Sequence, residues 1–368
     1  MESIVFLKKE LERILNYYCE KEKSDFLFFQ KYNRNLDKLG IIREILRKII
    51  PLKIKEELYS YFRKSNKNLW QVSSAEKKWA LDFLIYIIEK NPIIPYEFFP
   101  RKDHEEITKF VRNKILISFF DYIPQKELFD ENDLKKQKEW EIVFKKNKIN
   151  KKKEYYEFMG FKSKISHFEP NIFFEKYGLN FLNSKEKLRN STIIDCGAYI
   201  RDSAFVFKKE LNPKKIICIE PDEKNFDILI ENIKLNNLEE IIPIKIAIGE
   251  KGFRGDIYLS GSGSYISESK NGNIQISTID NLIFDQLKIE NVGLIKMDIE
   301  GFEFLAIKGA EKTIKNFKPI LIICVYHKGQ DFFEIPNYLK KIVPEYKFSF
   351  ININFKSPIF EKILIAQL

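Results

Sequence analysis

Cysteine, long apolar runs and glycine-rich motifs are all scarce in this sequence of 368 residues. The four cysteines stand far apart and form no CxxC pair, which argues against a disulfide framework or a zinc site and fits a reducing compartment. The longest uninterrupted apolar runs, such as 320–326, are far too short to span a bilayer. The charged N-terminus lacks the apolar core of a signal peptide. We therefore expect a cytoplasmic protein without a transmembrane segment.

Three nucleotide-related signatures are also missing. Proteins that bind NAD or FAD carry G-x-G-x-x-G after their first strand, so that the pyrophosphate lies on a helix N-terminus. Here only the first of these glycines, Gly197, is present. The sequence also has no P-loop lysine and no N/D-P-P-Y/F tetrad of the kind used in base methylation. These absences exclude a pyrophosphate cradle and disfavour nucleic acid as the substrate.

Positive charge is concentrated in the first part of the chain. Residues 1–160 contain 34 Lys and Arg against 26 Asp and Glu, a balance of +8 within the total of +10. A basic half is compatible with an acidic partner such as nucleic acid, anionic lipid or a nucleotide-activated substrate. The lysines are interleaved with acids, however, and we favour a solvated surface over a dedicated binding face.

The same region reads as mostly helical. Apolar residues recur at helical spacing over residues 2–20, 41–64, 73–90, 103–122 and 125–147. In the helix over 73–90, Ser73 and Glu76 have the spacing of a capping box, and Asp103 is placed to cap the next helix. Residues 146–154 are rich in lysine and are expected to be a solvated linker. We predict a helical accessory domain over residues 1–160 that binds the acceptor or a partner protein.

From about residue 165 the pattern changes to strands that alternate with helices. Strands are expected at 192–195, 215–219, 241–248, 256–259, 274–278, 292–298, 319–326 and 346–353, and helices at 200–210, 222–236, 302–316 and 331–342. Such alternation predicts a mostly parallel sheet covered on both faces. The Gly/Ser/Asn-rich stretch 261–273 is expected to be a mobile loop near the strand ends.

Three of the expected strands end on a carboxylate. Asp195 ends the first strand and is followed by Gly197, Glu220 ends the second strand 25 residues after Asp195, and Asp298 ends a later one. The carboxyl ends of parallel strands meet at one edge of a sheet, where such folds bind their ligands. An acid in the position of Glu220 suits the hydroxyl groups of a ribose. The three acids therefore point to a nucleoside-type cofactor.

A family resemblance gives this pattern a more specific interpretation. The chain carries, in this order, the segments IIDCGAYIRDSA, IEPDEKNF, AIGEKG, STIDNL, IKMDIEGFEFLAIKGAEKTI and KPILIICVYHKGQD. With this set, residues 165–350 resemble the FkbM family of S-adenosylmethionine-dependent methyltransferases. The resemblance covers about half of the chain. It implies S-adenosyl-L-methionine as the cofactor and a Rossmann-like class I methyltransferase fold over residues 161–368, with a mostly parallel seven-stranded sheet and helices on both faces.

The resemblance also implies a set of cofactor contacts. Asp195 and the backbone of Gly197 would face the methionine moiety, with Ser203 close by, and Glu220 would accept both ribose hydroxyls. The adenine would lie near Asp222 and Phe226, and Ile246 and Ala247 would form one wall of its slot. The remaining implied contacts are Ala198, Tyr199, Arg201, Pro221 and Asp298.

The catalytic candidates follow from the chemistry of methyl transfer. Transfer from a sulfonium is an in-line displacement in which alignment supplies most of the acceleration, but an alcohol acceptor must also lose its proton. Asp298, Glu300 and His327 are our candidate bases. The alternatives are a strand-end histidine bonded to a loop for His327 and an acid that favours the helix dipole for Glu300. We expect no metal; a metal held by these three residues is the alternative.

Two positions depart from the family pattern. Arg201 stands where the family usually has a glycine, and we expect its side chain to reach the cofactor carboxylate rather than to obstruct the pocket. Near the C-terminus, Asn352 and Asn354 replace an Arg-His pair that the family often has. This second departure concerns acceptor binding more than cofactor binding.

The sequence thus predicts an S-adenosylmethionine-dependent O-methyltransferase. Its acceptor is expected to be a carbohydrate or another hydroxyl-bearing molecule, such as a sugar of a bacterial surface glycan or its precursor. The acceptor rests on family analogy alone, and a homo-oligomer is left open. The alternatives are a methyltransferase fold that has lost turnover and serves as a scaffold, and a nucleic-acid methyltransferase.

Overall fold

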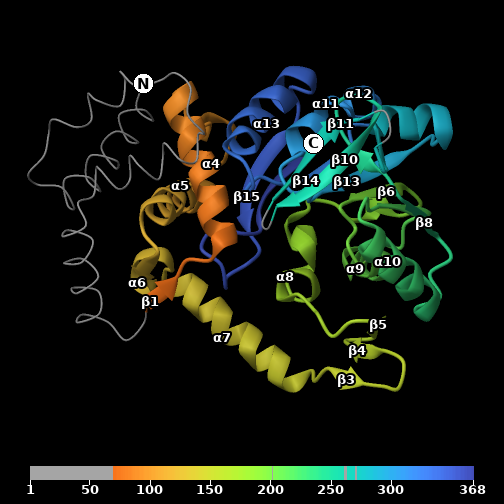
Figure 1. Cartoon of the computed structure of the whole chain (residues 1–368), viewed down its shortest axis with the longest axis horizontal. Helices are drawn as coiled ribbons and strands as arrows, with labels where there is room; N and C mark the ends of the chain where they lie inside the picture. The colour runs from red at the N-terminus through yellow and green to blue at the C-terminus, as the bar shows by residue number, and fades with distance from the viewer. Residues whose placement is uncertain (1–68, 201, 261–262, 270–271) are drawn as a thin grey trace, which may run out of the picture.

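The computed structural model describes residues 69–368 apart from residues 201, 261–262 and 270–271 (Figure 1). The helices predicted over residues 2–20 and 41–64 lie outside the described residues, as does Arg201. No helix in the described ranges is long and apolar enough to cross a bilayer.

A seven-stranded sheet forms the centre of the molecule. Its strands are β6 (Thr192–Cys196), β7 (Lys215–Ile219), β8 (Ile241–Ile244), β13 (Val292–Met297), β14 (Ile320–Cys324), β15 (Lys347–Asn352) and β16 (Lys362–Gln367). They are arranged in the order β15-β16-β14-β13-β6-β7-β8. The five strands from β14 to β8 are parallel, and β16 runs antiparallel to both of its neighbours. This topology confirms the predicted Rossmann-like, mostly parallel sheet.

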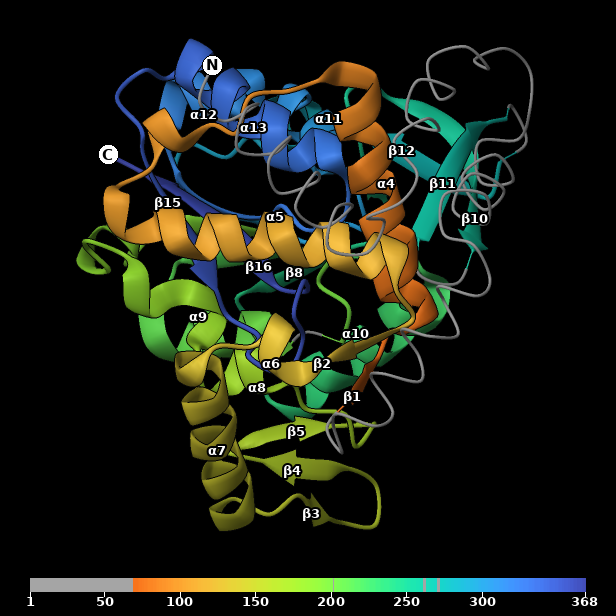
Figure 2. The same cartoon turned by 90° about the vertical axis from the view of Figure 1, so that its left-hand side faces the viewer.

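Helices cover both faces of this sheet (Figures 1 and 2). One face carries α9 (Asp202–Leu211) and α10 (Glu223–Leu235), and the other carries α11 (Glu303–Lys308), α12 (Glu311–Phe317) and α13 (Gly329–Ile342). The central strands are continuous apolar runs because both of their faces are buried. The helix expected over 302–316 is broken at Gly309, where an added Cβ would lie 2.1 Å from the carbonyl oxygen of Gly249.

The first described helices pack directly on this layer. Helix α4 (Ser74–Lys90) begins with the predicted capping box, since Ser73 accepts from the Glu76 amide at 3.2 Å and its own amide donates to the Glu76 carboxylate at 2.9 Å. Helix α5 (His104–Phe119) packs on α4 and β15, and α4 packs on α13. Aromatic rings of both helices join one continuous hydrophobic core with the sheet. The predicted domain boundary at residue 160 stays a prediction.

Asp103 does not cap α5. Its side chain makes no capping bond and instead accepts a hydrogen bond from the backbone amide of Phe350 at 2.9 Å. The carboxylate therefore ties the start of α5 to strand β15, a partner that local sequence spacing does not reveal.

The segment after α5 leads away from the sheet (Figure 2). The helix predicted over 125–147 is present as α6 (Gln125–Leu128) and α7 (Glu131–Lys146). The expected linker at 146–154 contains the short strand β3 (Asn150–Lys151), which pairs with β4 (Tyr156–Phe158), and β4 pairs with β5 (Phe161–Ser163). The chain then returns through α8 (Pro170–Phe173) and the 3-10 helices η3 (Lys176–Phe181) and η4 (Glu186–Leu188).

The prediction of a mobile loop over 261–273 was wrong for part of that stretch. Strand β11 (Gly263–Glu268) pairs antiparallel with β10 (Phe253–Ser260), which pairs in turn with β12 (Ile274–Ser277), while β12 pairs with β9 (Ala247–Ile248). Backbone pairing holds β11, and a Gly/Ser-rich composition does not show such pairing. Strand β16 was likewise absent from the prediction; it pairs antiparallel with β15, the strand before it in the chain, and with β14.

The remaining elements are short. They are the two-stranded pair β1 (Leu69–Gln71) and β2 (Tyr122–Pro124), the 3-10 helices η1 (Tyr96–Phe98) and η2 (Arg101–Asp103), and the π-helical turn η5 (Asn281–Gln286).

Candidate functional site

A cavity of about 930 Å³ opens where the carboxyl ends of the parallel strands meet. The strand ends of β6, β7 and β13 contribute to its walls, as expected for an open α/β sheet. Eleven of the predicted site residues line it: Gly197, Ala198, Tyr199, Ser203, Glu220, Pro221, Asp222, Ile246, Ala247, Asp298 and Glu300. The cavity therefore brings most of the predicted set together.

The turn after β6 needs glycine for two reasons. Gly197 has a φ of +75°, and an added Cβ would lie 1.8 Å from the carbonyl oxygen of Asp298. The turn is therefore in contact with the end of β13, which no larger residue permits. The amides of Gly197 and Ala198 both donate to the carbonyl oxygen of Ile219 at 3.0 Å, so the same turn is also tied to β7.

Glu220 is fixed at the rim by two backbone amides. Its Oε2 accepts from the amide of Tyr199 at 3.0 Å, and its Oε1 accepts from the amide of Asp222 at 3.0 Å. Burial raises its pKa above the ordinary value, against the opposing effect of these hydrogen bonds. Each oxygen keeps a lone pair for a ligand. This geometry suits a bidentate contact with two neighbouring hydroxyl groups.

The structure places Asp195 below the cavity floor rather than in its wall. Its side chain is fully buried and does not line the cavity. Its Oδ2 accepts from the Ser203 hydroxyl at 2.6 Å, and its Oδ1 lies 3.1 Å from the Nζ of Lys296. The Lys296 ammonium also donates to the carbonyl oxygen of Gly197 at 2.7 Å. Asp195 is therefore neutralised within the protein, and it acts on the glycine turn through Lys296.

Two other predicted residues do not line the cavity: Phe226 is half-buried on α10, and His327 is buried. Arg201 lies outside the described residues. The interpretation of Arg201 as a ligand for the cofactor carboxylate stays a prediction.

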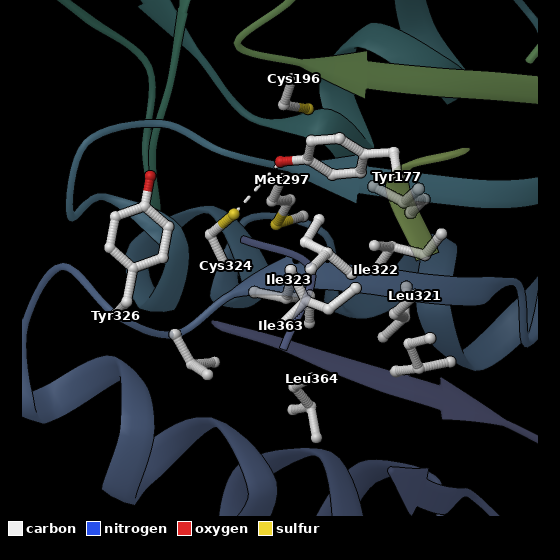
Figure 3. Close-up of a cluster of buried hydrophobic side chains, with 14 of the residues drawn as sticks. Tyr177, Cys196, Met297, Leu321, Ile322, Ile323, Cys324, Tyr326, Ile363 and Leu364 are labelled. Atoms are coloured by element: carbon white, nitrogen blue, oxygen red, sulfur yellow. Dashed lines mark hydrogen bonds between the residues drawn. The ribbon is translucent and has the colours of Figure 1, made fainter. Parts of the chain in front are cut away.

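Asp298, directly after β13, is the centre of a polar cluster. Tyr177 from η3 donates to its Oδ2 at 3.0 Å, and Tyr326 donates to its Oδ1 at 3.4 Å and to Glu361 at 3.2 Å. Figure 3 shows the two tyrosines with Cys324, to which the Tyr177 hydroxyl is also bonded at 3.2 Å. The two tyrosines that bond to Asp298 thus come from segments far apart in the chain.

The two carboxyls of this cluster have opposite pKa shifts. Burial alone would raise the pKa of Asp298, but the positive charges of Lys296 and His327 lower it. For Glu361, burial and then the charges of Asp298 and Glu169 raise the pKa well above its ordinary value. The shifts therefore favour the ionised form of Asp298, a hydrogen-bond acceptor, and the protonated form of Glu361, a donor.

His327 sits among acids. Its Nδ1 lies 2.9 Å from Glu303, and its Nε2 lies 3.7 Å from both Asp298 and Glu300. Burial lowers the pKa of His327, but the charges and hydrogen bond of these acids outweigh it and raise the pKa to about 10. The ring is therefore protonated at neutral pH, and in that form it stabilises the ionised state of Asp298.

Two groups of side chains near the cavity have the spacing of metal ligands. Asp298, Glu303 and His327 form one, and Asp298, Cys324 and Glu361 form the other. The first group differs from the predicted alternative metal site, which consisted of Asp298, Glu300 and His327, in having Glu303 in place of Glu300. Its histidine is protonated at neutral pH, and a metal would have to displace that proton. The prediction that no metal is needed stays a prediction.

Sequence reasoning missed eleven polar residues that line the cavity. Six of them lie inside segments that carry the family resemblance, which does not show which acid each would contact: Asp202, Glu223, Lys224, Asn225, Lys296 and Tyr326. The other five come from segments without a recognisable motif: Glu169, Tyr177, Lys245, Asn273 and Glu361.

Comparison with known proteins gives one family match. Residues 195–350 match the model of the methyltransferase FkbM domain. Among curated protein sequences, none matches the chain.

Two solved structures that match this chain are distant from it in sequence. A methyltransferase FkbM from Methylobacillus flagellatus KT is 24% identical with a TM-score of 0.42, and the match covers 54% of this chain and 48% of that one. TYW2 from M. jannaschii, solved in complex with AdoMet, is 20% identical with a TM-score of 0.32, and the match covers 60% and 84% of the two chains. This chain therefore spans about half the length of the FkbM protein that it matches. Its fold is identified by its own strand order.

Proposed function

We propose that this chain, whose residues 195–350 match the model of the methyltransferase FkbM domain, is an S-adenosylmethionine-dependent methyltransferase that methylates a hydroxyl group. The observation that carries the proposal is Glu220, held at the rim of the cavity by the amides of Tyr199 and Asp222. A carboxylate anchored in this way accepts two adjacent hydroxyls and so selects a ribose.

The residues of the cavity fit this cofactor. Glu220 would hold the ribose, and the apolar side chains of Ile246 and Ala247 beside it would form a wall for the adenine. The cavity volume of about 930 Å³ lies within the range of cofactor sites. A carboxylate oxygen of Asp202, buried in the cavity wall without a partner among the described residues, offers a further contact.

We assign to Asp298 the role of the base that accepts the proton of the acceptor's hydroxyl group. When bound, S-adenosylmethionine supplies a methyl group made electrophilic by the positive sulfur. Asp298 lies at the strand end next to the glycine turn, is ionised at neutral pH, and is oriented by the hydroxyls of Tyr177 and Tyr326. It can accept the hydroxyl proton of an acceptor as the new bond forms. A low pKa makes Asp298 a weak base, so alignment contributes more than basicity.

His327 and Glu300 then have supporting roles. A protonated His327 cannot itself accept a proton, and we propose that it holds Asp298 in place across 3.7 Å. Glu300, whose side chain is 57% exposed, stands at the mouth of the cavity, where it can contact the acceptor. These assignments retain the three predicted catalytic residues but give the base function to one of them.

The proposed acceptor is a sugar hydroxyl of a surface glycan or its precursor. Support comes from the polar cluster around Asp298, where Tyr177, Tyr326 and a protonated Glu361 can exchange hydrogen bonds with neighbouring hydroxyls. The choice of a glycan rests on family analogy. Turnover with candidate nucleotide sugars, followed by mass spectrometry, tests it.

Cofactor binding is the first experiment. Titration calorimetry with S-adenosylmethionine should show binding to the wild type and a loss of about tenfold or more in Glu220→Ala, because two charge-assisted bonds are removed. Glu239→Ala, an exposed carboxylate near the end of α10, is the matched control and should bind as the wild type does. Absence of binding to the wild type would overturn the proposal. Full activity after dialysis against a chelator would remove the metal alternative.

A nucleic-acid acceptor is the second candidate, and one observation favours it. Residues 135–164 contain 11 lysines and 4 acids, a balance of +7 on α7 and the β3–β5 strands, which lead away from the sheet. Such a surface binds phosphates in a salt-dependent way. A gel shift with RNA at physiological salt, lost in the charge-reversed variant K151E/K152E/K153E, would favour this candidate over a sugar.

A further inference from the structure

Two acids line the cavity without an assigned ligand group. Glu169 immediately precedes α8, and Asp202 is the first residue of α9. Both line the same cavity as Glu220 and Asp298, and α8 packs against α9. Burial and then the charge of Glu169 raise the pKa of Asp202 to about 7. The negative charge of one acid therefore disfavours the ionised form of the other.

Asp202 has an unused hydrogen-bond acceptor. Its side chain is 2% exposed, its Oδ1 accepts from the amide of Ser203 at 3.0 Å, and its Oδ2 is buried with no hydrogen-bond partner among the described residues. Native proteins leave few buried carboxylate oxygens unpaired. Because this oxygen belongs to a cavity-lining residue, a ligand that carries a donor can supply the bond.

Glu169 is also available on this side. It makes no capping bond to α8, and the hydrogen bond that the structure gives its carboxylate is from His167 Nε2 to Oε1 at 3.0 Å. His167 is 57% exposed, so this pair lies toward solvent. Glu169 itself lines the cavity.

Two of the described lysines that line the cavity are already paired with acids. Lys296 pairs with Asp195 at 3.1 Å and donates to Gly197, and Lys245 pairs with Glu223 at 2.8 Å. Asp195, the acid expected to face the methionine moiety, is therefore neutralised and out of reach. Glu169 and Asp202 add negative charge to a cavity that is proposed to receive a cationic cofactor.

We propose that Glu169 and Asp202 form the binding subsite for the ammonium group of the cofactor's methionine tail. This inference rests on the proposed function. The sulfonium carries no N–H, and the ribose is accounted for by Glu220, whereas the ammonium offers three donors. Two carboxylates on different elements can share these donors, and the ammonium relieves the repulsion between them. In this proposal Asp202 and Glu169, rather than Asp195, contact the methionine moiety of the cofactor.

Binding of three related nucleosides distinguishes the contribution of this subsite from that of the rest of the pocket. S-adenosylmethionine has the ammonium and the carboxylate, its decarboxylated form keeps the ammonium, and 5′-methylthioadenosine lacks both. We expect Asp202→Asn and Glu169→Gln each to weaken the first two by about ten- to hundredfold in titration calorimetry, and to leave 5′-methylthioadenosine unchanged. Glu210→Gln, on the same helix as Asp202 but paired with Lys176 at 2.8 Å, is the control and should bind all three as the wild type does.

The outcomes distinguish this inference from the proposed function. If the wild type binds none of the three nucleosides, the proposed function fails. If the wild type binds them and both variants keep the same preference for S-adenosylmethionine over 5′-methylthioadenosine, the subsite is overturned. A variant that leaves all cofactor affinities unchanged but raises the acceptor KM would also overturn it, since the acids would then serve the acceptor. Because the two acids lie on different elements, a folding defect in one variant leaves the other as a test.

Discussion

Removing the charge of Lys296 should destabilise the whole domain. The ammonium is 3% exposed, lies 3.1 Å from Asp195, donates to the Gly197 carbonyl at 2.7 Å, and stands 5.0 Å from the Tyr177 ring centre. Lys296→Met would leave the carboxylate of Asp195 buried with one hydroxyl partner. Breaking a buried pair in this way costs about 3–5 kcal/mol, a large part of the stability of a typical domain.

The double variant provides the decisive comparison. In Asp195→Asn/Lys296→Met no unpaired charge remains, so we expect it to lose less stability than the sum of the two single variants, by about 1–3 kcal/mol. Urea unfolding followed by circular dichroism measures all four proteins. Lys308→Met, which breaks an exposed pair with Glu250, is the control and should change the unfolding free energy by less than about 1 kcal/mol. Additive losses in the double variant would refute the assignment of a coupled buried pair.

Three further predictions concern the same region. The pKa of His327 is raised to about 10 in the folded protein, so the stability that it contributes is complete below its unfolded pKa of about 6.5 and is lost as the pH rises toward 10. The difference in unfolding free energy between wild type and His327→Gln should therefore fall by about 1.4 kcal/mol per pH unit from pH 7 to 9. A difference that stays constant with pH would contradict the raised pKa. Gly197→Ala should prevent folding or cofactor binding, because its Cβ would lie 1.8 Å from a carbonyl oxygen, whereas Gly252→Ala meets its first atom at 3.6 Å and should fold normally by circular dichroism. Asp298→Asn should lower kcat by about 10²–10⁴-fold with a much smaller change in cofactor affinity, and unchanged turnover would exclude Asp298 as the base.

Part of the site was predictable because it is local. A buried apolar strand that ends on an acid and is followed by a glycine turn can be recognised from consecutive residues. Gly197 and Glu220, which were predicted in this way, line the cavity. The capping box of Ser73 and Glu76 belongs to the same class of local signal. The mostly parallel sheet followed from strands that alternate with helices, since parallel neighbours need a crossover between them.

The partners of those acids were not predictable, because strand pairing selects them. Register places Lys296 directly opposite Asp195 on the neighbouring strand, so a residue that is 101 positions away (296 − 195) neutralises the acid that we expected to face the ligand. The partners of Asp298 are equally distant, since Tyr177 comes from η3, before the first strand of the sheet. No spacing rule connects such positions.

By itself, the sequence determined which strands end on acids, where the glycine turn must be, and which class of fold results, because each depends on the conformational preferences and burial of neighbouring residues. Only the tertiary structure decided which of those acids stay available to a ligand. Asp195 pairs with Lys296 on the neighbouring strand, whereas Asp202, at the start of α9, and Glu169, in the segment before α8, line the same cavity. The reason is physical: charge is balanced in space, between side chains that folding brings within a few ångströms, and not along the chain.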